Sequence, residues 1–196
     1  ARAAPGGVRH EVVEIDAPSG GSRRWEVSGW PSMQGHNWGT GHADTYAWGH
    51  CNAWNEPEGK DLVFEGFSGK VRIGRRLVTP LVTLVAVRHR GVRYEAQAAR
   101  ELVRARGSLE GLRRWSFFAR QAGATIEGTL SLQDDDTVGL YYPNPNGEMT
   151  YCLNSKLAHA SLRFVPQGRA PINVTSDAAA LEIGTHEAGH GIRMYV

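Results

Sequence analysis

Residues 124–132, with the sequence ATIEGTLSL, decide the fold class of this chain. Apolar Ile126, Leu130 and Leu132 alternate with polar side chains such as Glu127 and Thr129. Successive side chains of a β-strand point to opposite faces, so this alternation is typical of a strand with one buried face. The stretch predicts a strand at the surface of an all-β protein.

Similar strand-like runs recur along the chain at intervals of about ten residues, as in sandwiches and barrels. The chain has 24 Gly and 9 Pro among 196 residues, and this Gly content is nearly twice the usual share of roughly 7%. Turn sequences such as Gln121-Ala122-Gly123 separate the runs. We therefore predict an all-β, antiparallel fold, a barrel or a strongly bent sheet, and exclude a helical bundle.

The expected organisation is one domain over residues 24–196, preceded by a lead-in strand and linker over residues 1–23. Residues 94–106 are rich in Ala, Glu and Arg, lack Gly and Pro, and favour one short helix. Residues 179–183 and 191–196 are interpreted as strands of a closing hairpin.

Composition excludes several classes of function. The net charge is only +2, and no dense block of Lys or Arg suits a nucleic-acid backbone, so we expect no nucleic-acid partner. No run of about 18 apolar residues occurs, so we expect no transmembrane helix. Cys51 and Cys152 are the only cysteines, and their spacing decides neither their pairing nor the cellular compartment.

The most informative stretch spans residues 36–54, where aromatic and polar side chains fill the even positions. From residue 43 the odd positions hold only small side chains, which would let another layer approach that face closely. The other face is either the lining of a cavity for a large apolar ligand or an aromatic belt in the core. The even positions are His36, Trp38, Thr40, His42, Asp44, Tyr46, Trp48, His50, Asn52 and Trp54.

Two histidine patterns raise the question of a metal site. On a continuous strand His42 and His50 would lie about 26 Å apart, too far to share one ion. Residues 186–190, HEAGH, match the pattern of zinc peptidases, which needs both histidines on one helical face and a third ligand. Glycines surround this motif, and the chain ends six residues later. We therefore interpret it as a loop, reject a metalloprotease and expect no metal.

The motif His36-Asn37-Trp38-Gly39, followed by Tyr46-Ala47-Trp48-Gly49, resembles the lipocalin-like superfamily of carotenoid hydratases, AttH-type proteins, tocopherol cyclases and Diels–Alderases. Residues 142–147 and 152–156 are similar to a downstream signature of the same superfamily. The resemblance covers residues 24–196. It implies a lipocalin-like β-barrel, the second of a pair, so that a second lipocalin-like domain or another copy of the chain is a candidate partner.

Three functions are consistent with these features, and none requires a cofactor. The first is binding of a hydrophobic isoprenoid- or polyketide-like molecule in a barrel cavity. The second, implied by the resemblance, is a hydratase, cyclase or isomerase with Asp44 as general acid, oriented by His50 or Tyr46. The third is a structural half-barrel that packs on a partner domain. The expected ligand-binding residues are His36, Trp38, His42, Trp48, Asn52 and Trp54.

Overall fold

The computed structural model describes residues 11–16, 20–28, 33, 43–70, 72–73 and 77–195, in two compact units. The first unit, residues 1–38, contains an antiparallel hairpin of β1 (Glu11–Asp16) and β2 (Ser22–Val27). The second unit, residues 39–196, contains all the other elements. The short strands β5 (Arg72–Ile73) and β6 (Leu77–Val78) pair only with each other in the described part of this unit.

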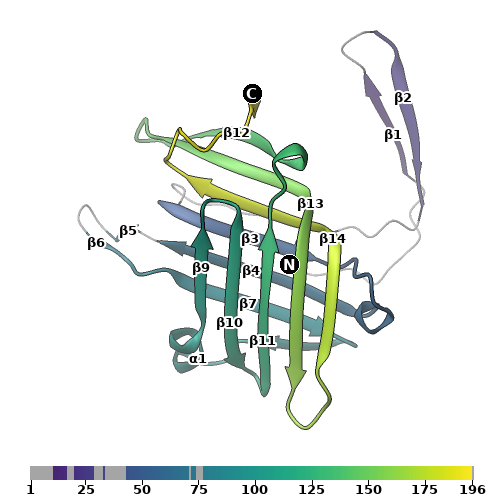
Figure 1. The fold of residues 1–196 in the computed structure, drawn as a ribbon, viewed down its shortest axis with the longest axis vertical. Coiled ribbons are helices and arrows are strands. Elements are labelled where there is room, and N and C mark those ends of the chain that lie inside the picture. The colour runs from purple at the N-terminus through teal and green to yellow at the C-terminus, as the bar shows by residue number, and fades with distance from the viewer. Residues whose placement is uncertain are drawn as a thin grey trace. The chain divides into compact units, whose positions relative to one another are not determined.

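The main sheet of the second unit is antiparallel along the path β8-β7-β4-β3-β14-β13-β11-β10-β9 (Figure 1). Strand β12 extends it beside β13, and β15 pairs with β12 in parallel. The strands are β3 (Thr45–Cys51), β4 (Leu62–Lys70), β7 (Val82–His89), β8 (Val92–Glu95), β9 (Arg106–Glu110), β10 (Arg114–Gln121), β11 (Ala124–Ser131), β12 (Val138–Pro143), β13 (Met149–Pro166), β14 (Ile172–Thr185) and β15 (Met194–Tyr195).

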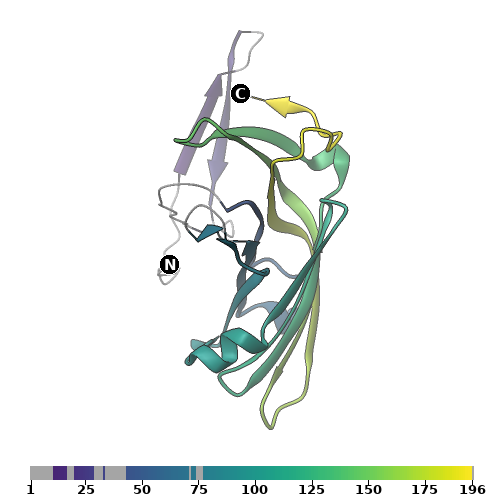
Figure 2. The same ribbon diagram turned by 90° about the vertical axis from the view of Figure 1, so that its left-hand side faces the viewer.

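Two long strands bend this sheet into two layers. The first part of β13 pairs with β12, and the part from His159 onward pairs with β11. The pairing of β13 with β14 is interrupted by register shifts between Ser155 and Ala160, and such irregularities bend strands. Strands β9 to β11 therefore cross over β3, β4 and β7, as Figures 1 and 2 show.

The hydrophobic core fills the space between the layers and depends on the small side chains of β3. Ala47, Gly49 and Cys51 face inward. A Cβ atom on Gly49 would lie only 2.7 Å from Leu130 Cδ2 and 2.9 Å from Trp115 Cζ3. The second layer thus packs directly on the small-residue face, which is one of the arrangements that the alternation in this stretch allows.

The predicted fold class is confirmed: the unit is a strongly bent antiparallel sheet with one short helix, α1 (Ala99–Arg104). Among the described residues the sheet does not close, and β8 and β9 lie at its ends. The hairpin between β10 and β11 turns at Ala122 and Gly123, both with positive φ, which matches the twist of the strands. None of the described helices is long and apolar enough to cross a membrane.

Three local predictions need correction. The helix covers six residues rather than residues 94–106, because residues 92–95 and 106–110 pair as strands β8 and β9. The expected closing hairpin is wrong, since β15 pairs with β12 and not with β14. The strand predicted over residues 179–183 is the end of the longer β14. Residues 186–190 form a loop with a turn, as predicted.

Candidate polar and aromatic site

The even-numbered side chains of β3 lie on the face of the sheet opposite the core. Tyr46, Trp48 and His50 alternate with core residues Ala47, Gly49 and Cys51, so strand geometry directs them to this outer face. Their neighbours on the adjacent strands are Phe67 and Glu65 of β4. We call this surface, formed by β4, β3, β14, β13 and β12, the outer aromatic face.

Tyr46 reaches across β14 to Cys152 on β13. Gly184 of β14 is the cross-strand neighbour of both Tyr46 on one side and Cys152 on the other. A Cβ atom at Gly184 would lie 1.9 Å from Tyr46 Cε1, so the phenol ring lies over this glycine. The Cys152 thiol lies near the side chains of Tyr46 and Tyr142, and its Sγ lies 4.0 Å from Glu182 Oε2.

Burial keeps these three groups protonated. It raises the pKa of Tyr46 and Tyr142 above the ordinary tyrosine value, and the negative charge of nearby Glu182 adds to the effect. Burial likewise raises the pKa of the Cys152 thiol, again with a contribution from Glu182. The cluster therefore offers neutral hydroxyl and thiol groups at neutral pH and contains no thiolate nucleophile.

Glu182 places a carboxyl group beside these residues. Asn154 Nδ2 donates a hydrogen bond of 2.6 Å to Glu182 Oε1, and Lys156 Nζ lies 3.4 Å from the same oxygen. Trp48 is the direct cross-strand neighbour of Glu182 on β3. The Lys156 ammonium lies 5.5 Å from the centre of the Trp48 ring, so the face of this indole already accommodates a cation.

His50 stacks against Trp48, with ring centres 6.4 Å apart, and is only 8% exposed. Both of its ring nitrogens are buried without a hydrogen-bond partner among the residues that the structure describes. Burial lowers the pKa of His50 despite the neighbouring Glu65 carboxylate, so its imidazole is neutral. Trp48 Nε1 donates to Glu65 Oε1 at 3.3 Å, which fixes the indole within this group.

The remaining predicted site residues are placed differently. Asp44 immediately precedes β3, and its backbone N–H donates to the carbonyl of Lys70 at 3.1 Å. Asn52 follows β3, where strand alternation has ended. Trp54 packs against the core and donates from Nε1 to the Leu62 carbonyl at 2.9 Å. His36, Trp38 and His42 lie outside the described residues.

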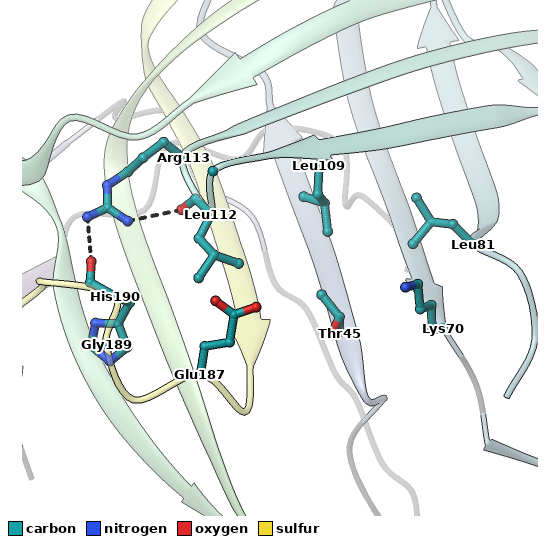
Figure 3. A pocket seen from close by; sticks show the side chains of 10 residues that line it. Thr45, Lys70, Leu81, Leu109, Leu112, Arg113, Glu187, Gly189 and His190 are labelled. Atoms are coloured by element: carbon teal, nitrogen blue, oxygen red, sulfur yellow. Dashed lines mark hydrogen bonds between the residues drawn. The ribbon is translucent and has the colours of Figure 1, made fainter. Parts of the chain in front are cut away.

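The second unit also has a pocket on the inner side of the sheet, of about 730 Å³, shown in Figure 3. It opens between the two layers, where β3 begins and β4 ends. Thr45 and Lys70 line it on these two strands, opposite Leu109 at the end of β9 and His190 of the loop after β14. Tyr46, Trp48 and His50 are not among its lining residues.

Sequence reasoning about β3 alone did not select Glu182, Tyr142, Cys152, Asn154 or Lys156. All but Glu182 fall within the two segments that carry the downstream resemblance, residues 142–147 and 152–156. Glu182 is an acidic residue in an otherwise largely apolar run. This contrast is the feature of the sequence that could have indicated it as a site residue. Only the register of β12, β13 and β14 brings these residues beside Tyr46 and Trp48.

Metal ligation has no support within the described ranges, where no group of three or more His, Cys, Asp or Glu side chains could hold an ion. His186 and His190 lie in a loop rather than on one helical face. His186 Nδ1 lies 2.8 Å from the Met149 carbonyl oxygen, and His190 Nδ1 accepts the Ile192 backbone N–H at 3.1 Å. The chemistry available on the outer aromatic face is hydrogen bonding, proton transfer and stabilisation of positive charge by aromatic rings.

The strongly bent antiparallel sheet agrees with the lipocalin-like class that the sequence predicts. The family model described as tocopherol cyclase-like matches residues 18–185, and the chain belongs to this family. A comparison with curated proteins found no match. Among solved structures, the chain is similar to a protein assigned as AttH from Nitrosomonas europaea, with 17% sequence identity and a TM-score of 0.42. The match covers 74% of this chain and 51% of that chain, so this chain spans about half the length of the matched protein.

Proposed function

We propose that this protein binds a hydrophobic, isoprenoid- or polyketide-like small molecule that carries a polar group, on the outer aromatic face. The observation that carries this proposal is the buried imidazole of His50, whose ring nitrogens have no partner within the described residues, next to half-buried Trp48. An unpartnered buried polar group costs roughly 1–3 kcal/mol. A hydroxyl or carbonyl group of a bound molecule would provide the missing hydrogen bond.

The surroundings of His50 suit the apolar part of such a molecule. Phe67 stacks on Tyr46 with ring centres 6.1 Å apart, and Trp48 lies on the same face. The Lys156 side chain is 63% exposed and lies over the Trp48 ring, so it can move into solvent when a ligand takes its place. The tocopherol cyclase-like family supports the isoprenoid class of ligand.

Equilibrium binding of farnesol, an isoprenoid alcohol, tests this proposal. We expect His50→Leu and Trp48→Leu each to weaken binding by about tenfold, the equivalent of one lost hydrogen bond or aromatic contact. His159→Leu is the matched control, because His159 is an exposed histidine of β13 that pairs with Asp177. Unchanged affinity in both His50→Leu and Trp48→Leu, with thermal unfolding confirming that they fold, would refute the proposed site.

A second candidate function is acid-initiated cyclisation, favoured by the Glu182 carboxyl group beside the Trp48 ring. Glu182 is paired with Lys156, so this reaction requires the substrate to displace Lys156 and the carboxylate to take up a proton from solvent. Glu182 would then give this proton to an alkene carbon of the substrate, leaving a carbocation against the indole. A hydroxyl oxygen of the same substrate would then attack the cation, and its proton would return to the carboxylate. The product is an isomer of the substrate, so the reaction needs no oxidant or other co-reactant.

Reaction in heavy water separates this candidate from simple binding. Cyclisation would place one non-exchangeable deuterium at the protonated carbon, which mass spectrometry of the product detects. Glu182→Gln and Asp44→Asn distinguish the two candidate acids: loss of turnover with retained ligand binding in only one variant identifies the proton donor. Unaltered turnover in both variants would exclude both residues as the acid.

A further inference from the structure

The pocket on the inner side of the sheet is separate from the outer aromatic face and has its own chemistry. It lies at the opening between the two layers, and its volume of about 730 Å³ is within the usual range for small-molecule sites. Lys70 and Thr45 form a cross-strand pair at one wall. The opposite wall is formed at the turn from β9 to β10 by Leu109, Gly111, Leu112 and Arg113 (Figure 3).

Lys70 provides a cation in this opening. It is two residues from buried Ser68 on the same strand, so its side chain starts from the core-facing side of β4. Within the described part of the chain Lys70 makes no ion pair. Arg113, the other basic side chain of the pocket, is already engaged by Asp134 and by the carbonyl oxygens of Leu112 and His190.

His190, which also lines the pocket, carries a buried hydrogen-bond donor. Its Nδ1 accepts the Ile192 N–H, which requires the neutral tautomer with the proton on Nε2. Burial, together with the charge of Arg113, lowers the pKa of His190, consistent with a neutral ring. The Nε2–H group is buried and finds no acceptor among the residues described.

The apolar part of the pocket is short. Leu81, Leu109 and Leu112 contribute to its lining. Deeper in the sheet the layers are joined, since Trp115 Nε1 donates to Ser68 Oγ at 2.9 Å and Ser68 Oγ lies 2.8 Å from Thr83 Oγ1. All three of these side chains are fully buried, so the two layers are in close contact at this level.

We propose that this pocket binds a medium-chain carboxylate amphiphile, with its carboxylate at Lys70 and His190 and its tail against the leucines. Both protein groups are donors, and a carboxylate is an acceptor with two oxygens. The carboxylate of Glu187 also lines the pocket, but Glu187 is exposed and can turn toward solvent. Because the two layers are in contact beneath the pocket, we expect it to accommodate a ligand tail of medium length and not a long one.

Calorimetric titration with decanoate, below its aggregation concentration, tests this site. We expect decanoate to bind the full chain, and Lys70→Met to weaken binding by about tenfold because one charge-assisted hydrogen bond is lost. Lys60→Met is the matched control, since Lys60 is exposed outside the pocket. Decanol should bind wild type and Lys70→Met equally, and the decyltrimethylammonium cation should not bind.

Two results would overturn the proposal: no binding of decanoate to wild type, or equal affinity of wild type and Lys70→Met for decanoate. Trp48→Leu separates this site from the outer aromatic face. We expect Trp48→Leu to bind decanoate as wild type does, and Lys70→Met to bind farnesol as wild type does. Loss of decanoate binding in Trp48→Leu would assign decanoate to the outer face and refute the inner site.

Discussion

His50 makes the stability of this protein sensitive to acid. Burial lowers the pKa of His50 in the folded state, whereas a histidine in the unfolded chain titrates near 6.5. Above pH 6.5 both states are neutral and this group adds no pH dependence. As the pH falls below about 6.5, the unfolded chain takes up the proton first, so the free energy of unfolding falls until the folded-state pKa is passed.

We therefore expect His50→Leu to retain more of its stability than wild type as the pH falls below 6.5. Urea unfolding at a series of pH values gives, for each protein, the slope of the free energy of unfolding against pH. His89 and His190 also have pKa values lowered chiefly by burial, so some of the acid sensitivity should persist in the variant. An identical slope for the two proteins would show that His50 does not titrate differently on folding.

At the scale of single residues, sequence pattern predicts part of the candidate site. Alternation in β3 correctly places Tyr46, Trp48 and His50 on one face. It does not reveal which face meets the second layer, because both an aromatic face and a small-residue face can pack. It also fails beyond Cys51, where the strand ends and Trp54 turns to the core.

Strand β14 positions the tyrosine of the outer aromatic face through Gly184. Any Cβ atom at this position would overlap the Tyr46 ring, so the ring or the strand must shift. We expect Gly184→Ala to destabilise the fold by roughly 1–3 kcal/mol, the usual cost of overpacking. Thermal or urea unfolding measures the loss.

Gly189→Ala is the matched control for that substitution, because a Cβ atom at Gly189 would meet nothing within 4 Å. It should leave stability nearly unchanged. Equal stability of Gly184→Ala and wild type would mean that the Tyr46 ring is not held across β14, and the contact between Tyr46 and Cys152 would lose its basis.

The sequence pattern predicts that a strand exists more reliably than it predicts how long the strand is. Residues 149–153 and 157–165 look like separate strands, but they belong to one strand of 18 residues, β13. The register shifts between Ser155 and Ala160 allow it to serve both layers. The polar residues in this interval suggest a loop locally, and only pairing with β14 and β11 makes them part of a strand.

For the whole second unit, Gln121 joins the layers at the end of β10. Its Nε2 donates to the carbonyl oxygens of Val85 at 2.6 Å and Tyr94 at 3.2 Å, and the side chain is buried. We expect Gln121→Leu to lower the free energy of unfolding by roughly 1–3 kcal/mol, because it removes the donor to both carbonyl groups. Urea unfolding measures this change.

Gln133→Leu, at an exposed position between β11 and the following turn, provides the control and should have little effect. If Gln121→Leu were as stable as wild type, the hydrogen bonds between the layers would contribute little. Core packing around Trp115 and Phe117 would then account for their association.

The all-β class follows from composition and alternation, but the open sheet path and the placement of β15 depend on distant pairings that local pattern does not specify. The hypothesis that the chain packs on a second lipocalin-like domain or another copy stays a prediction. The expected boundary between a lead-in at residues 1–23 and a domain at 24–196 also stays a prediction.

We propose that the outer aromatic face binds a hydrophobic molecule whose polar group pairs with His50. Nitrogen NMR of the protein labelled with ¹⁵N-histidine, titrated with farnesol, observes the two ring nitrogens of this residue. We predict a saturable change in the ring nitrogen shifts of His50, assigned with His50→Leu, while the signals of exposed His159 stay unchanged. Saturation with farnesol without any change at His50 would show that its polar group does not pair with this residue.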